Sequence, residues 1–293
     1  MNKNLNFNNS TKLLKIVSKY FDYTQEEVRD SKKLYGVTNS RQLQQYYFNL
    51  LKKRDYSNYI KYLYIDRVIP LVKNIRKDIK ILDAGCGLGT ESLLCGILGA
   101  NVTGIDISKE RLNVAKNRIK FYENKFQTKI NVQFHYENIL SHANKYDIIW
   151  VNEAISHIDP MNQFLKKCYH ILTDGGKLII SDANKLNPYV YFQSKKDQIK
   201  SGGIYQNVIH QDLPKGKEIS YAVERIFTIP SIKSLLSQFF KVKEVISIRF
   251  LPYPVYKFNT NIFLMIERNV LRKIPILNLF STTYVIISIK KNK

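Results

Sequence analysis

Short apolar runs alternate with amphipathic stretches through the middle of the chain, between residues 79 and 182. The runs lie at residues 79–82, 101–105, 130–134, 146–151 and 177–181. Short apolar runs bounded by polar residues or glycine predict buried strands, and apolar residues at helical spacing predict helices between them, for example over residues 109–122. Strands that alternate with helices at this spacing predict an α/β fold with a parallel, doubly wound sheet.

The segment before this region, residues 1–78, has the pattern of a helical cap. Leu13, Leu14 and Val17 begin an apolar stripe at helical spacing. Residues 24–27 (Thr-Gln-Glu-Glu) resemble a capping box that starts a second helix, with Gly36 as its stop signal. Later in this segment tyrosines alternate with lysines and arginines, a pattern that suits either base stacking or a helical core, and we favour the core.

The segment after residue 182 continues the pattern with two additions. A helix over residues 230–239 and strands over 242–250 and 283–289 extend the sheet, while 184–220 and 252–281 read as insertions. Within the second insertion, residues 258–273 form an apolar helix with a basic end. Such a helix can lie on a membrane surface or line an apolar substrate channel. The alternative is that it packs against the insertion 184–220.

The most informative motif follows the strand at residues 79–82. Asp83 ends the strand, and Gly85, Gly87 and Gly89 then occupy every second position around Cys86. Glycines allow a sharp turn that lies close to a ligand, because a Cβ atom would collide there. A dinucleotide-binding loop would need a further glycine where the chain has threonine, so that alternative fails.

This motif resembles the nucleotide loop of class I S-adenosylmethionine (SAM)-dependent methyltransferases. The resemblance implies a Rossmann-like, seven-stranded sheet whose last strand is antiparallel, formed here by residues 79–293, with SAM as cofactor. It assigns the methionine end of SAM to Asp83 and the glycine loop, the ribose hydroxyls to Asp106, and the adenine edge to Asn138. Family members carry Asp where this chain has Asn138. The implied cofactor-binding set is Asp83, Gly85, Cys86, Gly87, Gly89, Asp106, Ile107, Asn138, Ile139 and Asn152.

The residues after the fourth strand bear on the chemistry. Residues 153–160 resemble a region of small-molecule O-methyltransferases, such as those of ubiquinone biosynthesis. If this stretch is helical, Glu153 and His157 share one face at i, i+4 spacing. His157 and Glu153 are then the candidate catalytic pair, with His157 as general base for a hydroxyl acceptor or both residues orienting the acceptor. The alternative is a structural histidine that caps a helix or pairs with Glu153. The second glutamate of that region is Ser156 here, so we predict no metal site.

The charge distribution and the cysteine content indicate possible binding partners and a cellular compartment. The chain has 293 residues and a net charge of +22. The net charge is +9 for residues 1–78, +1 for 79–182 and +12 for 183–293. Such basic flanks suit nucleic acid, anionic lipid or phosphorylated ligands, although compositional drift is an equal alternative. Three cysteines without metal-binding spacing, and a start without an apolar core, predict a cytoplasmic protein, with peripheral membrane contact as an option.

These observations support a SAM-dependent methyltransferase that acts, at oxygen, on a small or lipid-like acceptor. We expect the acceptor to lie under a lid built from residues 1–78 and 184–220. Two alternatives stay open at this point: an RNA-directed methyltransferase, favoured by the basic flanks, and a SAM-binding scaffold without catalysis. The sequence leaves the oligomeric state open.

Overall fold

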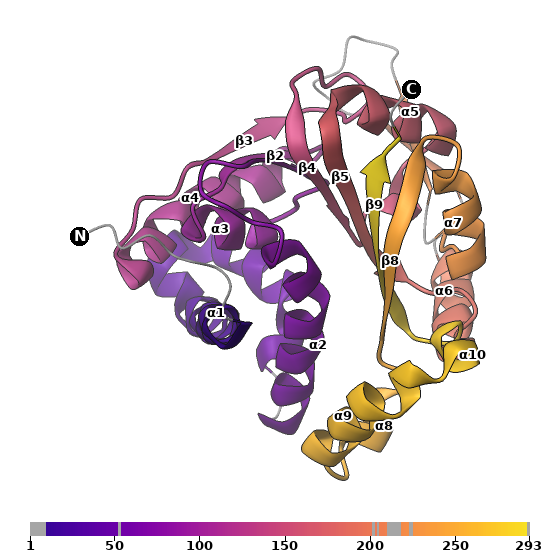
Figure 1. Ribbon diagram of the computed structural model, residues 1–293. Helices are drawn as coiled ribbons and strands as arrows, with labels where there is room; N and C mark the ends of the chain where they lie inside the picture. The colour runs from indigo at the N-terminus through magenta and orange to yellow at the C-terminus, as the bar shows by residue number, and fades with distance from the viewer. Residues whose placement is uncertain are drawn as a thin grey trace.

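A seven-stranded sheet forms the centre of the computed structural model, which describes residues 10–51, 54–200, 203, 205–209, 218–222 and 225–291 (Figure 1). The strands lie in the order β3-β2-β1-β4-β5-β9-β8, and β9 alone runs antiparallel to its neighbours. Their bounds are β1 Lys80–Ala84, β2 Asn101–Asp106, β3 Val132–Tyr136, β4 Tyr146–Asn152, β5 Leu172–Ala183, β8 Phe240–Ile248 and β9 Thr283–Lys290. The predicted fold class is therefore confirmed.

The strand order reverses next to β1, which pairs in parallel with β2 on one side and β4 on the other. The chain moves outward from β1 to β3, then returns across the sheet to β4. In sheets of this kind the crevice for a ligand opens beyond the carboxyl ends of the strands at the reversal point. The loops after β1, β2 and β4 meet there, which brings the predicted motifs together.

Helices cover both faces of the sheet and bury an apolar core on each. Helices α3 (Thr90–Ile97) and α4 (Lys109–Phe126) cover one face, and α5 (Met161–Ile171) and α7 (Ile229–Leu236) cover the other. Strand β4 shows the alternation: Ile148 and Trp150 join the first core, whereas Ile149 and Val151 join the second. Each such fully buried side chain stabilises the fold by about 1.5–3 kcal/mol.

The N-terminal helices pack on the same face as α3 and α4. They are α1 (Ser10–Tyr46), the short η1 (Phe48–Leu51) and α2 (Arg54–Val72). We call residues 1–78 the cap; residues 1–9, 52 and 53 of it lie outside the described residues. Apolar side chains of α1 and α2 belong to the same buried cluster as those of α3 and α4. Of the later aromatic residues of the cap, Tyr59 and Tyr64 are buried, as expected for a helical core, whereas Tyr46 and Phe48 are exposed.

The predicted capping box at Thr24 is wrong, because α1 continues through it. The Thr24 hydroxyl donates to the carbonyl of Tyr20 and also bonds to the hydroxyl of Tyr122, so it caps no helix. Gly36, the predicted stop, has φ 74° and instead marks a kink inside α1. The polar residues of this stretch serve contacts between the cap and α4, which a local pattern does not reveal.

A buried ion pair joins the cap to the core. Arg118 of α4 and Glu27 of α1 are both fully buried, and the guanidinium donates through Nε and Nη2 at 2.9 and 2.8 Å. Arg118 also donates to the carbonyl of Leu88, inside the glycine loop, at 2.6 Å. Bidentate arginine–carboxylate pairs combine strength with a fixed geometry. The cap and the glycine loop are thus held by one guanidinium.

The two insertions lie near each other. The first contains α6 (Pro188–Lys200) and a hairpin of β6 (Tyr205–Ile209) and β7 (Glu218–Ala222), and residues 201, 202, 204 and 210–217 of the predicted lid lie outside the described residues. The second contains α8 (Tyr253–Tyr256), α9 (Thr260–Asn269), η3 (Leu271–Lys273) and α10 (Pro275–Asn278). The predicted helix 258–273 is therefore shorter, with its regular part at α9.

The second insertion is fastened to the cap as well as to the first insertion. Asp66 of α2 accepts from Arg249, Arg268 and Arg272, at 2.9, 2.8 and 3.1 Å. Asn184 donates to the carbonyls of Leu279 and Ser281, which ties the end of the insertion to the residues before α6. In the described part of the chain, no helix combines the length and apolar character needed to cross a bilayer.

Candidate active site

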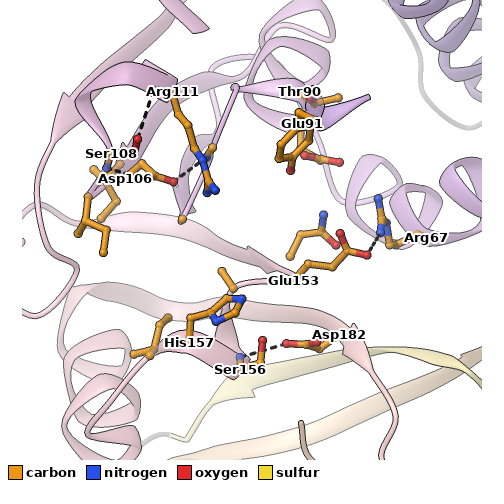
Figure 2. A pocket seen from close by; sticks show the side chains of 18 of the residues that line it. Arg67, Thr90, Glu91, Asp106, Ser108, Arg111, Glu153, Ser156, His157 and Asp182 are labelled. Carbon is orange, nitrogen blue, oxygen red and sulfur yellow. Dashed lines mark hydrogen bonds and ion pairs between the residues drawn. The ribbon is translucent and has the colours of Figure 1, made fainter. Parts of the chain in front are cut away.

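A cavity of about 1060 Å³ lies between the carboxyl ends of β1, β2, β4 and β5 and the cap. Figure 2 shows side chains from both sides directed toward it. The lining includes the predicted residues Gly85, Gly87, Asp106, Ile107, Asn138, Ile139, Asn152, Glu153 and His157. Residues far apart in the sequence therefore meet at one site, as the strand order requires. Ligand pockets usually measure about 300–1000 Å³, so this cavity has room for a nucleoside-sized ligand with a second molecule beside it.

The glycine loop approaches its neighbours too closely for side chains. Gly85 has φ 79°, and a Cβ atom built on it would lie 2.7 Å from the Cβ of Ala154. At Gly89, φ is 74° and the same atom would lie 2.4 Å from the ring of Phe134. The amides of Gly85 and Cys86 both donate to the carbonyl of Ile105. These contacts hold the loop flat, with its backbone facing the cavity.

Asp106 lies at the end of β2 and orders the loops on either side of it. One carboxylate oxygen accepts from the amide of Gly87 at 2.8 Å, and the other accepts from the amide of Ser108 at 2.9 Å. A carboxylate has about four lone-pair sites, so two remain for a ligand. Asp106 therefore combines a fixed position with free accepting capacity, as a partner for ribose hydroxyls would.

Asn138 follows β3 at the far end of the cavity. Its side-chain carbonyl accepts from the amide of Leu140 at 2.9 Å, which leaves its second lone pair and the amide NH₂ for a ligand. Ile107 and Ile139 line the space beside it with apolar surface. Glu137 bonds to the buried His142, whose other ring nitrogen bonds to Tyr146, so this rim is well ordered. A flat heterocycle with a polar edge suits this end of the cavity.

The loop after β4 contributes both buried and charged groups. The side-chain oxygen of Asn152 is buried without a hydrogen-bond partner among the described residues. Buried polar atoms are normally paired, so this one indicates a site that a ligand completes. Glu153 has φ 50° and forms an ion pair with Arg67 of α2 at 2.5 Å (Figure 2). The cap thus supplies a cation to the cavity.

The predicted helical pairing of Glu153 with His157 is not found. Only Ile155–His157 forms a helix, the 3₁₀ turn η2, and the left-handed backbone of Glu153 excludes that residue from it. Glu153 reaches Arg67 instead, while both Glu153 and His157 line the cavity (Figure 2). A positive φ in a residue other than glycine is uncommon and cannot be inferred from a helical pattern.

Three predicted residues do not line the cavity: Asp83, Cys86 and Gly89. Asp83 is buried beneath the loop, where it accepts from the hydroxyl of Ser92 at 2.6 Å. Burial, together with the charge of Glu91, raises the pKa of Asp83 to about 8. Burial likewise raises the pKa of the Cys86 thiol, which keeps it in the neutral form. Direct contact of these side chains with a ligand stays a prediction.

Sequence reasoning missed several cavity residues that the fold brings in. They are Tyr46 and Arg67 from the cap, Glu91 at the start of α3, Asp182 at the end of β5, and Ser156 of η2, which the motif comparison named but did not assign to the site. Glu91 directly follows the glycine loop, and that position was an available signal. Arg67 had none, because it precedes the loop within a helix that contains other basic residues.

Charge is concentrated where the cap meets the glycine loop. Burial raises the pKa of Glu91, and the nearby Arg67 opposes the shift. Burial would lower the pKa of Arg67, but Glu153 and Glu91 outweigh it and the pKa is raised. A fixed cation between two carboxylates suits a zwitterionic ligand, whose carboxylate and ammonium groups it can separate.

These features fit SAM. The cavity has a glycine-rich loop, and Asp106 provides a carboxylate for the ribose. The polar side chain of Asn138 lies beside apolar residues that suit adenine, and Arg67 with its two neighbouring carboxylates suits the amino acid end. Among the described residues, no group of three or more His, Cys, Asp or Glu side chains is placed to hold a metal ion. The residues present thus match a nucleoside-containing ligand with a charged tail.

Comparison with known proteins gives relatives of the same kind. A stretch of the chain is 36% identical to the ubiquinone biosynthesis O-methyltransferase of Pelagibacter ubique, over 39% of this chain and 47% of that protein. Another is 31% identical to the enzyme of the same name from Coxiella burnetii, over 46% of this chain and 54% of that protein. The match spans about half the length of these relatives.

Solved structures share the fold at low sequence identity. A SAM-dependent methyltransferase from Methanosarcina mazei has a TM-score of 0.52 at 19% identity, over 76% of this chain and 98% of that one. Magnesium protoporphyrin IX methyltransferase from Synechocystis, with bound SAM, has a TM-score of 0.51 at 14% identity, over 92% and 97%. The family model described as "Methyltransferase domain" matches residues 56–239. The chain therefore belongs to the methyltransferase domain family, with the class I SAM-dependent fold.

Proposed function

We propose that this protein transfers the methyl group of SAM to an oxygen atom of a small, apolar acceptor. One observation carries the proposal: His157 lines the same cavity as the glycine loop and Asp106. A candidate base and a candidate SAM site thus share one cavity. The names of the relatives, O-methyltransferases of ubiquinone biosynthesis, support oxygen as the acceptor atom.

The SAM side of the cavity is assigned by the contacts described above. Gly85 and Gly87 would face the amino acid end, with Arg67 as the cation for its carboxylate. Asp106 would accept from the ribose hydroxyls, and Asn138 would bond to the adenine edge. When bound, SAM supplies an electrophilic methyl group on a sulfonium ion, and the protein has to place an acceptor against it.

The acceptor side is formed by the cap. Leu50, Ile60 and Leu63 line this part of the cavity together with aromatic residues of α1 and α2. Ile158 extends the apolar surface from the loop after β4. An apolar wall of this size favours a ring system or a chain over a highly charged substrate. A lipid-like acceptor is therefore our preferred form of the small molecule.

The chemistry assigned to His157 is removal of the acceptor's hydroxyl proton. A neutral hydroxyl is a weak nucleophile, and a positioned base contributes typically 10²–10⁴-fold to such a step. Proximity supplies the rest, because the cavity holds two reactants together. Glu153 is engaged by Arg67, so we assign it to orienting the cap and the acceptor rather than to proton transfer.

Product analysis tests the proposal. Purified protein is incubated with methyl-labelled SAM and an extract of cells, and label is counted in organic-solvent, small-molecule, RNA and protein fractions. Label in the solvent or small-molecule fraction supports the proposal. Label in RNA would instead support the RNA-directed alternative, which the basic flanks favoured. Bound SAM without any labelled product would support the non-catalytic scaffold.

Substitution of His157 tests the assigned base. We expect His157→Ala to lower kcat about 100-fold or more while the Kd for SAM, measured calorimetrically, stays within about twofold. The matched control is His135→Ala, because His135 is exposed on β3 and does not line the cavity. Equal kcat values for the two variants would remove His157 from the mechanism.

A further inference from the structure

Helix α9 buries the carboxylate of Glu267 beside Leu264 and leaves most of its other apolar side chains exposed. Glu267 is fully buried and accepts from the backbone and guanidinium of Arg249, and from the hydroxyl of Tyr256. Ile262, Met265 and Ile266, at i, i+3 and i+4 on the opposite face, are exposed, with 57% of Met265 accessible. The outward face of a surface helix is normally polar, so the apolar outward face of α9 fits an apolar partner.

The exposed apolar surface continues beyond α9. It includes Phe258, which is 89% exposed, and Ile276, which is 66% exposed. We define the apolar ridge as Phe258, Ile262, Met265, Ile266, Val270, Ile274, Ile276 and Phe280. The residue before helix α6, Asn187, donates to the carbonyl of Phe280 at 2.8 Å, and α6 itself has exposed apolar residues, among them Phe192 and Ile199. Exposed apolar side chains gathered in this way mark an interaction surface, whereas single ones need no explanation.

The charges around the ridge have one sign. Lys257, just before Phe258, and Lys273, just before Ile274, are exposed, and Glu267, the single carboxylate within residues 252–281, is buried and paired. A hollow of about 530 Å³ beside Phe258 is lined by Lys257 together with Lys61 of α2, which also pairs with Asp22. The surface therefore offers ammonium groups next to apolar side chains.

This charge pattern selects among partners. Two copies of the chain meeting through their ridges would bring lysines of like charge together, which costs energy. An anionic bilayer instead places phosphates at the height of the lysines and acyl chains below them. A lysine near such a surface contributes about 1 kcal/mol, and apolar side chains add the area they bury.

We propose that the apolar ridge docks on the surface of an anionic phospholipid bilayer. The ridge enters the acyl boundary, and Lys257 and Lys273 contact the lipid phosphates. Through Asp66, the docked insertion is joined to α2, the helix that lines the acceptor side of the cavity. Docking therefore holds the cap close to the bilayer, where an apolar acceptor is dissolved.

Vesicle flotation tests the proposal with the full chain. The vesicles contain phosphatidylcholine with roughly 30% phosphatidylglycerol, or phosphatidylcholine alone. Two double variants are compared with the wild type: Ile262→Ser with Met265→Ser, and Lys257→Glu with Lys273→Glu. The control is Val37→Ser with Leu34→Ser, because these residues are exposed on α1, away from the ridge. Thermal unfolding shows that each variant is folded.

We expect the wild type to float with anionic vesicles and each ridge variant to bind them about tenfold more weakly or worse. The control should bind like the wild type. Absence of wild-type flotation, or equal flotation of the ridge variants, overturns the proposal. A wild-type dimer that the ridge variants convert to monomer overturns it in favour of a second copy. Flotation involves no methyl transfer, so this result is independent of the proposed function.

Discussion

The buried pair of Glu27 with Arg118 supports a sharp prediction about stability. The change is Glu27→Gln, which keeps the size of the side chain and removes its charge. In the wild type this carboxylate accepts from Arg118 twice, from Tyr122 at 2.7 Å and from Tyr35 at 2.7 Å. The neutral amide leaves a fully buried guanidinium without its counter-charge.

The size of the effect follows from the burial of both partners. Removing one member of a buried ion pair costs about 3–5 kcal/mol, because the remaining charge stays in a medium of low polarity. The total free energy of unfolding of a typical domain is only about 5–15 kcal/mol. We therefore expect Glu27→Gln to lower the unfolding free energy by about 3–5 kcal/mol and, for a chain of this length, Tm by about 5–8 °C.

The neighbouring residue provides the control. Glu26 pairs with Lys125 between the same two helices, but both side chains are partly exposed. Surface pairs contribute about 0–1 kcal/mol, so Glu26→Gln should shift Tm by no more than about 2 °C. Urea unfolding and calorimetry measure both variants. Equal losses for Glu26→Gln and Glu27→Gln would refute the argument from burial.

Two further predictions concern the glycine loop and Asp83. Gly89→Ala should weaken SAM binding and destabilise the fold, because Gly89 has φ 74° and the new Cβ would collide with the ring of Phe134. The control is Gly175→Ala: Gly175 has φ 72°, but its new Cβ would have no atom within 4 Å, so this variant should lose only about 1 kcal/mol to backbone strain. Calorimetry measures the Kd for SAM and the Tm of both variants. Equal losses of affinity and of Tm in Gly89→Ala and Gly175→Ala would contradict the steric explanation. Asp83 has a pKa raised from 3.8 to about 8 by burial and by Glu91, so its contribution to stability falls as pH rises from about 4 through 8. Urea unfolding without SAM, between pH 5 and 8.5, measures this decline, and Asp83→Asn should remove it. If the unfolding free energies of the wild type and the variant change in parallel with pH, the prediction is contradicted.

The central sheet and the glycine loop could be predicted from local sequence patterns. Apolar runs and glycine spacing predicted the strands and the loop after β1, because a buried parallel strand and a tight turn each restrict their own residues. Where a polar residue served a distant contact, the local pattern misled. Thr24 looks like a cap but bonds to Tyr122, and Glu153 looks helical but turns toward Arg67.

The candidate site was predictable on one side only. Asp106, Asn138 and Asn152 each follow a strand, and the strand order brings them to one edge. The opposite wall comes from the cap, where no motif separates Arg67 from other basic residues. Its position depends on how α2 packs against the sheet, which is a property of the whole fold.

Adjacent residues of α2 join two distant parts of the protein. Asp66 pairs with Arg268 and Arg272 of the second insertion, and the next residue, Arg67, pairs with Glu153 in the cavity. The ion pair with the second insertion and the ion pair in the cavity wall are therefore only one peptide unit apart on the same helix. Linkage between binding sites is reciprocal: if docking on a bilayer changes the affinity of the cavity for its ligands by some factor, the ligands change the affinity for the bilayer by the same factor. The coupling free energy between lipid binding and ligand binding in the cavity would then act through α2.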